Sequence, residues 1–162
     1  MKNILVTSLA TIVVPGAAVF LVPYLILQAT GELAPPQLGV VEAVSIAFAI
    51  VGMAMVIWVS VVFVTHGEGT PVPIEPPRNF VAAGLYRFVR NPMYLGAILV
   101  LFAEAALFRS LWILLYAGAL WLALHTFTVF LEEPQLERRF GDTYREYKAS
   151  TPRWLPRRPR GG

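Results

Sequence analysis

The 162-residue chain contains no cysteine, and its charged residues are scarce. The lack of cysteine excludes disulfide bonds, thiolate metal sites and a cysteine nucleophile, so any catalysis must rest on oxygen and nitrogen groups or on a cofactor. Only 14% of the residues are charged, whereas 57% are hydrophobic. A soluble domain typically has about 25% charged residues. This composition indicates a protein that is surrounded mainly by lipid.

Four long apolar runs follow one another along the chain. They cover about residues 4–28, 39–64, 93–108 and 111–131. A helix rises about 1.5 Å per residue, so about 20 residues cross the hydrocarbon core of a bilayer. The third run reaches this length only if its helix begins near Pro92 and continues past Phe108. The sequence therefore predicts an all-α integral membrane protein, a single domain with about four transmembrane helices.

The first run also has features of a cleaved signal peptide. Lys2 precedes the apolar stretch, and the small residues at 16–18 resemble a cleavage site. However, apolar residues continue through Leu27, well past that site. We therefore expect this run to be retained as a helix.

The basic residues are distributed unevenly between the two sides of the predicted spans. Twelve of the thirteen lie near the N-terminus, in the loop up to residue 92 or after residue 131, and only Arg109 lies on the other side. Because basic loops remain in the cytoplasm, we expect both termini to be cytoplasmic. The basic tail then has anionic headgroups of the lipid bilayer as its partner, and nucleic acid is not expected.

The segment 132–162 has the pattern of a cytoplasmic amphipathic helix. Pro134 follows the fourth run and can begin this helix, with Glu132 and Glu133 at the N-terminus, where carboxylates interact favourably with the helix dipole. Four apolar or aromatic residues recur at helical spacing: Leu136, Phe140, Tyr144 and Tyr147. Such a helix would lie along the membrane surface.

The segment 65–83 is rich in proline and glycine and is expected to be an extended loop. It is either a linker between the second and third spans or a lid over an active site.

A polar stripe runs along the fourth apolar run. Trp121, His125, Thr128 and Glu132 are spaced by four, three and four residues, so they share one helix face. Polar groups are costly against lipid, and we expect this face to point into the helix bundle. His125 then either bonds to a neighbouring helix or acts in catalysis together with Glu132.

Two further acids, Glu42 and Glu104, fall inside the second and third runs. Structural roles are expected for both, through a pair with Arg109 or with headgroups. The rival interpretation makes them part of an ion path in a non-catalytic, transporter-like or assembly protein.

Four sequence blocks carry a resemblance to a known family. They are GLYR at 84–87, VRNPMYLG at 89–96, EEPQL at 132–136 and FGDTYREY at 140–147. In order, spacing and membrane setting they resemble the isoprenylcysteine carboxyl methyltransferase family, which is related to the membrane phospholipid methyltransferases. The resemblance covers roughly residues 65–156 and is specific for the superfamily but not for the substrate.

The resemblance implies an integral membrane enzyme that uses S-adenosylmethionine and has no Rossmann domain. It implies that the cofactor lies between the cytoplasmic ends of the last spans and the C-terminal helix. The residues that would line this pocket are Arg90, Asn91, Pro92, Tyr94 and Gly96. Glu132 and Glu133 would hold polar groups of the cofactor, and Tyr144 and Tyr147 would help to close the pocket. The rings of Tyr86, Tyr94 and Tyr144 suit a sulfonium cation.

One residue departs from the family pattern. Most relatives have histidine where this chain has Asn91, and an amide cannot titrate near neutral pH. Proton transfer at this position is therefore excluded, whereas positioning of the cofactor is not.

The expected activity is methyl transfer from S-adenosylmethionine to a lipophilic or lipidated acceptor, with no metal site. A carboxylate acceptor is already ionised at pH 7. A phospholipid amine must lose a proton, for which His125 or a glutamate is the candidate base. The absence of the motif histidine favours an acceptor that needs no base, and the oligomeric state is not indicated.

Overall fold

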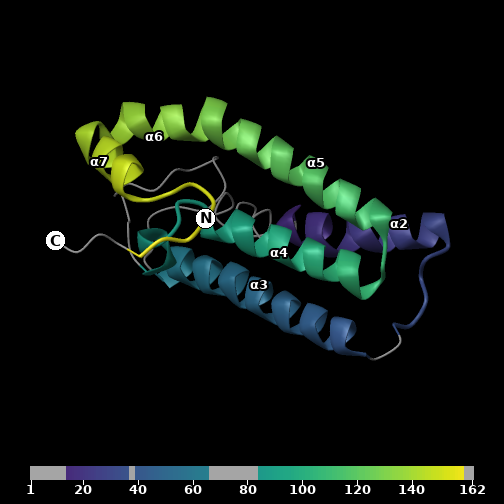
Figure 1. Ribbon diagram of the computed structural model, residues 1–162. Helices are drawn as coiled ribbons and strands as arrows, with labels where there is room; N and C mark the ends of the chain where they lie inside the picture. The colour runs from purple at the N-terminus through teal and green to yellow at the C-terminus, as the bar shows by residue number, and fades with distance from the viewer. Residues whose placement is uncertain (1–13, 37–38, 66–83, 159–162) are drawn as a thin grey trace.

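The computed structural model describes residues 14–36, 39–65 and 84–158, and all regular structure in these residues is helical (Figure 1). In chain order the elements are η1 (Ala17–Leu21), α2 (Val22–Thr30), α3 (Val40–Thr65), η2 (Gly84–Arg87), α4 (Pro92–Leu107), α5 (Leu111–Phe127), η3 (Thr128–Glu132), α6 (Glu133–Phe140) and α7 (Asp142–Ser150). The predicted all-α fold is confirmed for this part of the chain. The start of the first apolar run and the proline-rich loop at 66–83 lie outside the described residues.

Two helices are long and apolar enough to cross a membrane. They are Val40–Val62 and Leu111–Phe140. The helices at Val14–Thr30 and Pro92–Leu107 are also apolar but shorter. Large apolar side chains such as Ile50, Trp112 and Leu122 are exposed along these helices. An apolar surface of this kind suits lipid.

Helix α4 matches the apolar run at 93–108 and does not continue past Phe108. Pro92 is in its first turn, where the missing N–H has no cost, and the helix ends at Leu107 rather than continuing past Phe108. The cause lies in the next residues. Arg109 adopts a left-handed conformation with φ 51°, and the Ser110 hydroxyl accepts a hydrogen bond from the Ile113 N–H at 3.2 Å, which starts α5.

Helices α3 and α4 lie side by side (Figure 1) and touch through two glycines. A Cβ atom on Gly52 would lie 2.6 Å from the Gly96 carbonyl oxygen, and one on Gly96 would lie 2.7 Å from that of Gly52. Only hydrogen fits at either position, so the two backbones meet directly. The Arg109–Glu42 ion pair (Nη2–Oε1 2.9 Å) ties the start of α3 to the end of α4 and confirms one partner predicted for Glu42.

The last apolar run extends into one helix through α5, η3 and α6. The prediction that a new helix begins at Pro134 places the break too early. A π-helical turn at Thr128–Glu132 puts Pro134 in the first turn of α6, so the chain stays helical although proline has no N–H to donate. The break lies at Gly141, whose φ of 56° suits glycine, and α7 then turns back (Figure 1).

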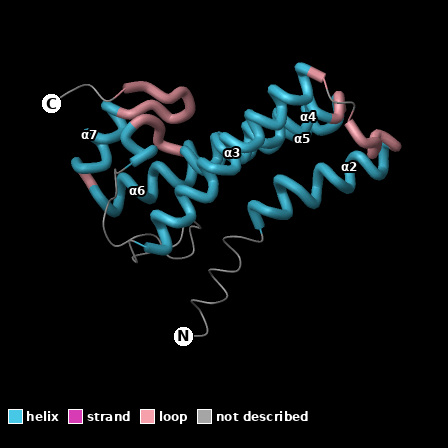
Figure 2. The backbone as a smooth tube through the Cα atoms, turned by 90° about the horizontal axis from the view of Figure 1, so that it is seen from below, coloured by secondary structure: helices cyan, strands magenta, loops and turns pink. Residues whose placement is uncertain are grey.

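Helix α2 packs at the opposite end of the bundle from α6 and α7 (Figure 2). Its Leu27 joins Ala105 of α4 and Ile113 of α5 in a buried cluster. The Tyr116 hydroxyl donates a hydrogen bond to the Ala18 carbonyl at 2.8 Å. The apolar contacts of α2 are thus at one end of the bundle, and the polar residues of the C-terminal half lie at the other end, beside α6 and α7.

Candidate active site

A backbone ladder joins the start of α4 to the C-terminal strap, which we define as residues 152–157. The Arg90 N–H donates to the Pro152 carbonyl at 2.9 Å, and the Arg157 N–H donates to the Phe88 carbonyl at 2.9 Å. The Asn91 side-chain amide adds a bond to the Arg153 carbonyl at 3.3 Å. Segments about 60 residues apart in the sequence are thereby held together at one end of the bundle.

Glu133 is buried at the centre of this region and is surrounded by cations. Arg90 Nη1 lies 2.7 Å from Oε1, and Arg153 donates from Nε (2.6 Å) and Nη2 (2.9 Å) to the two carboxylate oxygens. Lys148 Nζ lies 3.6 Å from Oε2. Lys148 also pairs with Glu137 (3.4 Å), so Arg90 and Arg153 are the two cations that face Glu133 alone. Two arginines around one carboxylate suit an anionic group of a ligand.

The cations also control the titration of Glu133, which lies beyond the apolar part of its helix, 111–131. Burial alone would raise the pKa of the carboxyl. The hydrogen bonds from Arg153 and the charges of Arg90, Arg153 and Lys148 outweigh burial and hold the pKa below its ordinary value. Glu133 is therefore fixed as an anion.

Glu132, the adjacent residue, has different surroundings. Its Oε2 accepts hydrogen bonds from the hydroxyl groups of Tyr94 and Thr128, each at 3.4 Å. Burial raises the pKa of Glu132, and the charge of Glu133 adds to this effect, while the two hydroxyl groups offset only part of it. No cation pairs with Glu132 among the described residues. The surroundings therefore raise the pKa of Glu132 and lower the pKa of its neighbour Glu133.

Tyrosine side chains surround the two glutamates. The Tyr147 hydroxyl donates to the Tyr86 carbonyl at 2.7 Å, and its ring centroid lies 6.1 Å from that of Tyr144. Burial, followed by the charge of Glu133, raises the pKa of Tyr144 to about 12. Burial also raises the pKa of Tyr86 and of Tyr147. These phenols therefore stay neutral and offer aromatic faces to a cation.

His125 belongs to an aromatic cluster with Trp121 and Trp154. Its ring stacks on Trp121 at a centroid distance of 5.4 Å, and Trp154 Nε1 lies 2.9 Å from His125 Nδ1. An indole N–H can only donate, so Nδ1 is the acceptor and the neutral imidazole carries its proton on Nε2. The sequence offered a bond from His125 to a neighbouring helix or a catalytic role; the structure gives His125 a partner in the non-helical strap instead.

The sequence profile of the phospholipid methyltransferase family matches residues 41–143, which include the Arg90–Glu133 pair. The chain belongs to the phospholipid methyltransferase family. A curated relative is methanethiol S-methyltransferase 1 of Bradyrhizobium diazoefficiens, which is 37% identical over 85 residues. That alignment covers 50% of this chain and 27% of the relative, so the chain matches about a quarter of the relative's length. No solved structure matches the chain.

Membership of this family confirms the relationship inferred from the sequence blocks at 84–147. Most of the residues that the resemblance assigned to the cofactor pocket lie at the α6–α7 end. The structure brings them together as three linked pairs: Arg90 with Glu133, Tyr94 with Glu132, and Tyr86 with Tyr147. Pro92 is buried in the first turn of α4, and Asn91 is bonded to the strap.

Gly96 is placed differently from these residues. It lies against Gly52 in the α3–α4 contact, which gives it a packing role whether or not a cofactor approaches it. Sequence reasoning also missed Arg153 and Trp154, which come after the matched residues. Trp154 could have been noticed because it is an aromatic residue with an N–H donor in a basic tail, and such a residue usually finds a hydrogen-bond partner when it is buried. The signal for Arg153 was only that a buried carboxylate needs a cation.

Proposed function

We propose that this chain transfers a methyl group from S-adenosylmethionine to a lipophilic acceptor at the cytoplasmic face of a membrane. The observation that carries the proposal is the buried Glu133, held by Arg90 and Arg153 beside the differently placed Glu132. Family membership supports the reaction class. The two helices that are long enough to span a bilayer support the membrane setting.

The donor groups of the site suit the proposed cofactor. Nε of Arg90 is buried and has no hydrogen-bond partner among the described residues. A buried donor of this kind is costly unless a ligand satisfies it, and the carboxylate of an amino-acid group would do so. Glu132 could accept hydrogen bonds from hydroxyl or amino groups. The cofactor would supply a methyl group on a positively charged sulfur, a charge that the rings of Tyr86, Tyr94 and Tyr144 would favour.

The residues of this chain would act mainly by positioning. In-line transfer needs a donor and an acceptor that are aligned and shielded from water. The strap would hold the site closed because it is anchored on both sides, by Arg153 on Glu133 and by Trp154 on His125. Both anchors are side chains of the same short segment, so loss of either would loosen the site.

The possible bases in the site are few. Asn91 cannot titrate, Nδ1 of His125 is occupied by Trp154, and Glu133 is held as an anion by its cations. We therefore propose an acceptor that reacts without a dedicated base, and a prenylated cysteine carboxylate is the acceptor of this kind that the sequence resemblance names. A phospholipid amine is the second candidate, favoured by the family description, and it would use Glu132 as the base. A small thiol enters the comparison because the named relative methylates methanethiol.

The transporter-like alternative was based on Glu42 and Glu104, and only Glu104 still favours it. Glu42 is paired with Arg109 and is therefore occupied structurally. We propose four membrane crossings with cytoplasmic termini, in which the helices at 14–30 and 92–107 add to the two longer ones.

Calorimetric titration of S-adenosylhomocysteine into protein in nanodiscs tests the cofactor site. We expect binding by the parent and at least about tenfold weaker binding by Glu132→Gln and Glu133→Gln, because each variant replaces a carboxyl group of the proposed cofactor site by an amide. Glu137→Gln is the matched control, since Glu137 lies one turn further along and pairs with Arg145 and Lys148. A folded parent without binding, or equal losses in all three variants, would overturn the proposal.

A second assay identifies the acceptor once binding is established. Transfer of labelled methyl groups is followed for a prenylated cysteine, phosphatidylethanolamine and a thiol. Rates with a carboxylate acceptor should be nearly independent of pH between 6 and 8, because the acceptor is already ionised over this range and no base has to remove a proton from it. Transfer to the amine that rises with pH and disappears in Glu132→Gln would replace the carboxylate proposal with the amine one.

A further inference from the structure

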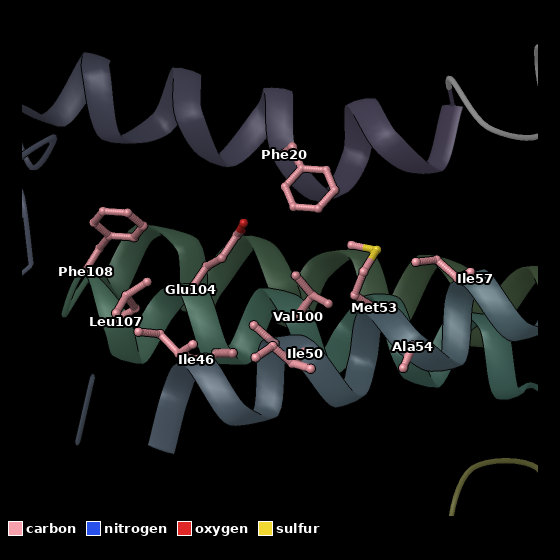
Figure 3. A pocket seen from close by; sticks show the side chains of 12 residues that line it. Phe20, Ile46, Ile50, Met53, Ala54, Ile57, Val100, Glu104, Leu107 and Phe108 are labelled. Carbon is pink, nitrogen blue, oxygen red and sulfur yellow. The ribbon is translucent and has the colours of Figure 1, made fainter. Parts of the chain in front are cut away.

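A groove of about 550 Å³ lies between η1 and the α3–α4 pair (Figure 3). Its walls include Phe20 of η1, Ile46, Ile50 and Met53 of α3, and Val100 and Glu104 of α4. Glu104 is the one charged residue among the twelve that line the groove. An apolar groove with one carboxyl group is an unusual surface for a protein to leave open.

The position of the groove determines what can reach it. Its α3 lining runs from Ile46 to Ile57, in the middle of a helix that is long and apolar enough to cross a membrane. The groove therefore runs along the middle of α3 to the end of α4, and most of its α3 wall would lie in the hydrocarbon core, where water and ions are scarce. A molecule that enters it must be soluble in the bilayer.

Glu104 supplies a specific requirement. Its Oε2 atom is buried and has no hydrogen-bond partner among the described residues. Figure 3 shows the carboxyl group directed toward the helix that carries Phe20, across the groove. An unsatisfied buried oxygen is costly, and a donor within the groove would remove that cost.

We propose that this groove binds a lipid-soluble aliphatic alcohol, with its hydroxyl group hydrogen-bonded to Glu104 and its chain along the apolar walls. An alcohol satisfies the carboxyl oxygen without bringing a charge into the groove. An ammonium ligand would instead require two charges to be desolvated in hydrocarbon. An alkane fits the walls but leaves the oxygen unsatisfied.

This site is separate from the proposed methyl-transfer site. Glu104 follows Tyr94 by ten residues on α4, which corresponds to about 15 Å along the helix. A hydroxyl group at Glu104 is therefore too far away to receive the methyl group. The inference does not depend on the proposed function, and thermal unfolding provides a check of folding that is independent of cofactor binding.

Photolabelling in nanodiscs tests the site, with a diazirine-bearing hexadecanol as the probe. We expect labelled peptides from 46–57 and 100–108, and competition by hexadecanol at least tenfold stronger than by hexadecane. Glu104→Gln keeps an acceptor oxygen and should retain labelling, whereas Glu104→Leu should lose the preference for the alcohol. Thermal unfolding of each variant reports folding, whether or not the chain binds S-adenosylhomocysteine.

The competition experiment uses the parent protein, so it is informative even if a variant fails to fold. Equal competition by hexadecane would overturn the proposal, because the groove would then be an ordinary lipid contact. An unchanged alcohol preference in Glu104→Leu would also overturn it. Loss of labelling in both variants, each shown to be folded, would also overturn the proposed hydrogen bond, because an acceptor oxygen at residue 104 would then not be sufficient.

Discussion

Arg153 donates two hydrogen bonds to Glu133, at 2.6 Å from Nε and 2.9 Å from Nη2, and so attaches the C-terminal strap to α6. The pair is two-pronged, and its carboxylate is buried. Geometry of this kind gives stronger and more directional bonds than a single contact. The strap and the long helix are therefore coupled through one side chain.

We predict that Arg153→Ala destabilises the protein by about 1–3 kcal/mol, because one charged partner of a buried carboxylate is removed while Arg90 remains. Arg153→Lys should recover only part of the loss, since an ammonium group cannot reproduce the two-pronged geometry. SDS titration in mixed micelles measures the change. Arg158→Ala, an exposed neighbour in the same tail, is the control. Equal stability of Arg153→Ala and Arg158→Ala would contradict the assigned coupling.

The glycine contact between α3 and α4 gives a second prediction. Gly52→Ala and Gly96→Ala should each cost about 1–3 kcal/mol, because the new methyl group meets a backbone carbonyl that cannot move without its helix. Gly118→Ala is the matched control within α5. Apart from its own neighbouring turns of helix, no atom of the described residues lies within 4 Å of a Cβ there, so this change should be neutral or stabilise by up to about 1 kcal/mol. The same SDS titration measures the stability of the three variants. Equal changes in stability for all three would rule out the close approach of α3 and α4.

Stability should depend on pH through Glu133. Its pKa in the folded protein lies below the ordinary value of 4.5, so the folded state favours the carboxylate. The resulting stability is fully present above the ordinary value and is lost as the pH falls through the folded pKa. The parent should therefore lose stability relative to Glu133→Gln as the pH falls from about 5 toward 3. Unfolding curves that stay parallel over this range would contradict the assigned ion pairs.

The lack of cysteine makes the proposed topology easy to test. Ala34→Cys lies in the turn after α2, and Glu146→Cys lies on the exposed side of α7. A membrane-impermeant maleimide added to intact cells should label Ala34→Cys and not Glu146→Cys, whereas both should react after permeabilisation. Labelling of the two positions from the same side would refute the proposed arrangement.

The Trp154–His125 bond predicts a spectroscopic signature. The chain has two histidines, so the nitrogen resonances of His125 can be assigned by one substitution at His66. Nδ1 should appear as the unprotonated acceptor and Nε2 as the protonated nitrogen. Trp154→Phe keeps the ring but removes the donor, and it should mix the two tautomers. A parent with Nδ1 protonated would be inconsistent with the bond.

The local features of this fold were predictable, and the non-local ones were not. The apolar run at 39–64 matches α3 closely, and Pro92 marks the start of α4, because both are consequences of nearby residues. The continuation of the helix through Pro134 depends on the π-helical turn at Thr128–Glu132, which has no simple sequence signal.

The candidate site shows the same division. The motifs identified Glu133 and Arg90, and their adjacency in space agrees with the resemblance. The choice of Arg153 as the second partner could not be read from the sequence, because several basic residues of the tail were equally available. Pairing of that kind is decided by the path of the strap, which is fixed by backbone bonds to residues 88–90.

The unbroken helix from Leu111 to Phe140 has a consequence for how the protein senses its surroundings. Its apolar half suits lipid, and its polar end carries Glu132 and Glu133. A change in bilayer thickness alters the tilt of a spanning helix, and a stiff rod transmits that tilt to whatever is fixed at its end. Assays in nanodiscs of graded acyl-chain length should therefore show an optimum. The thickness of the membrane would then help to set the geometry of the proposed active site.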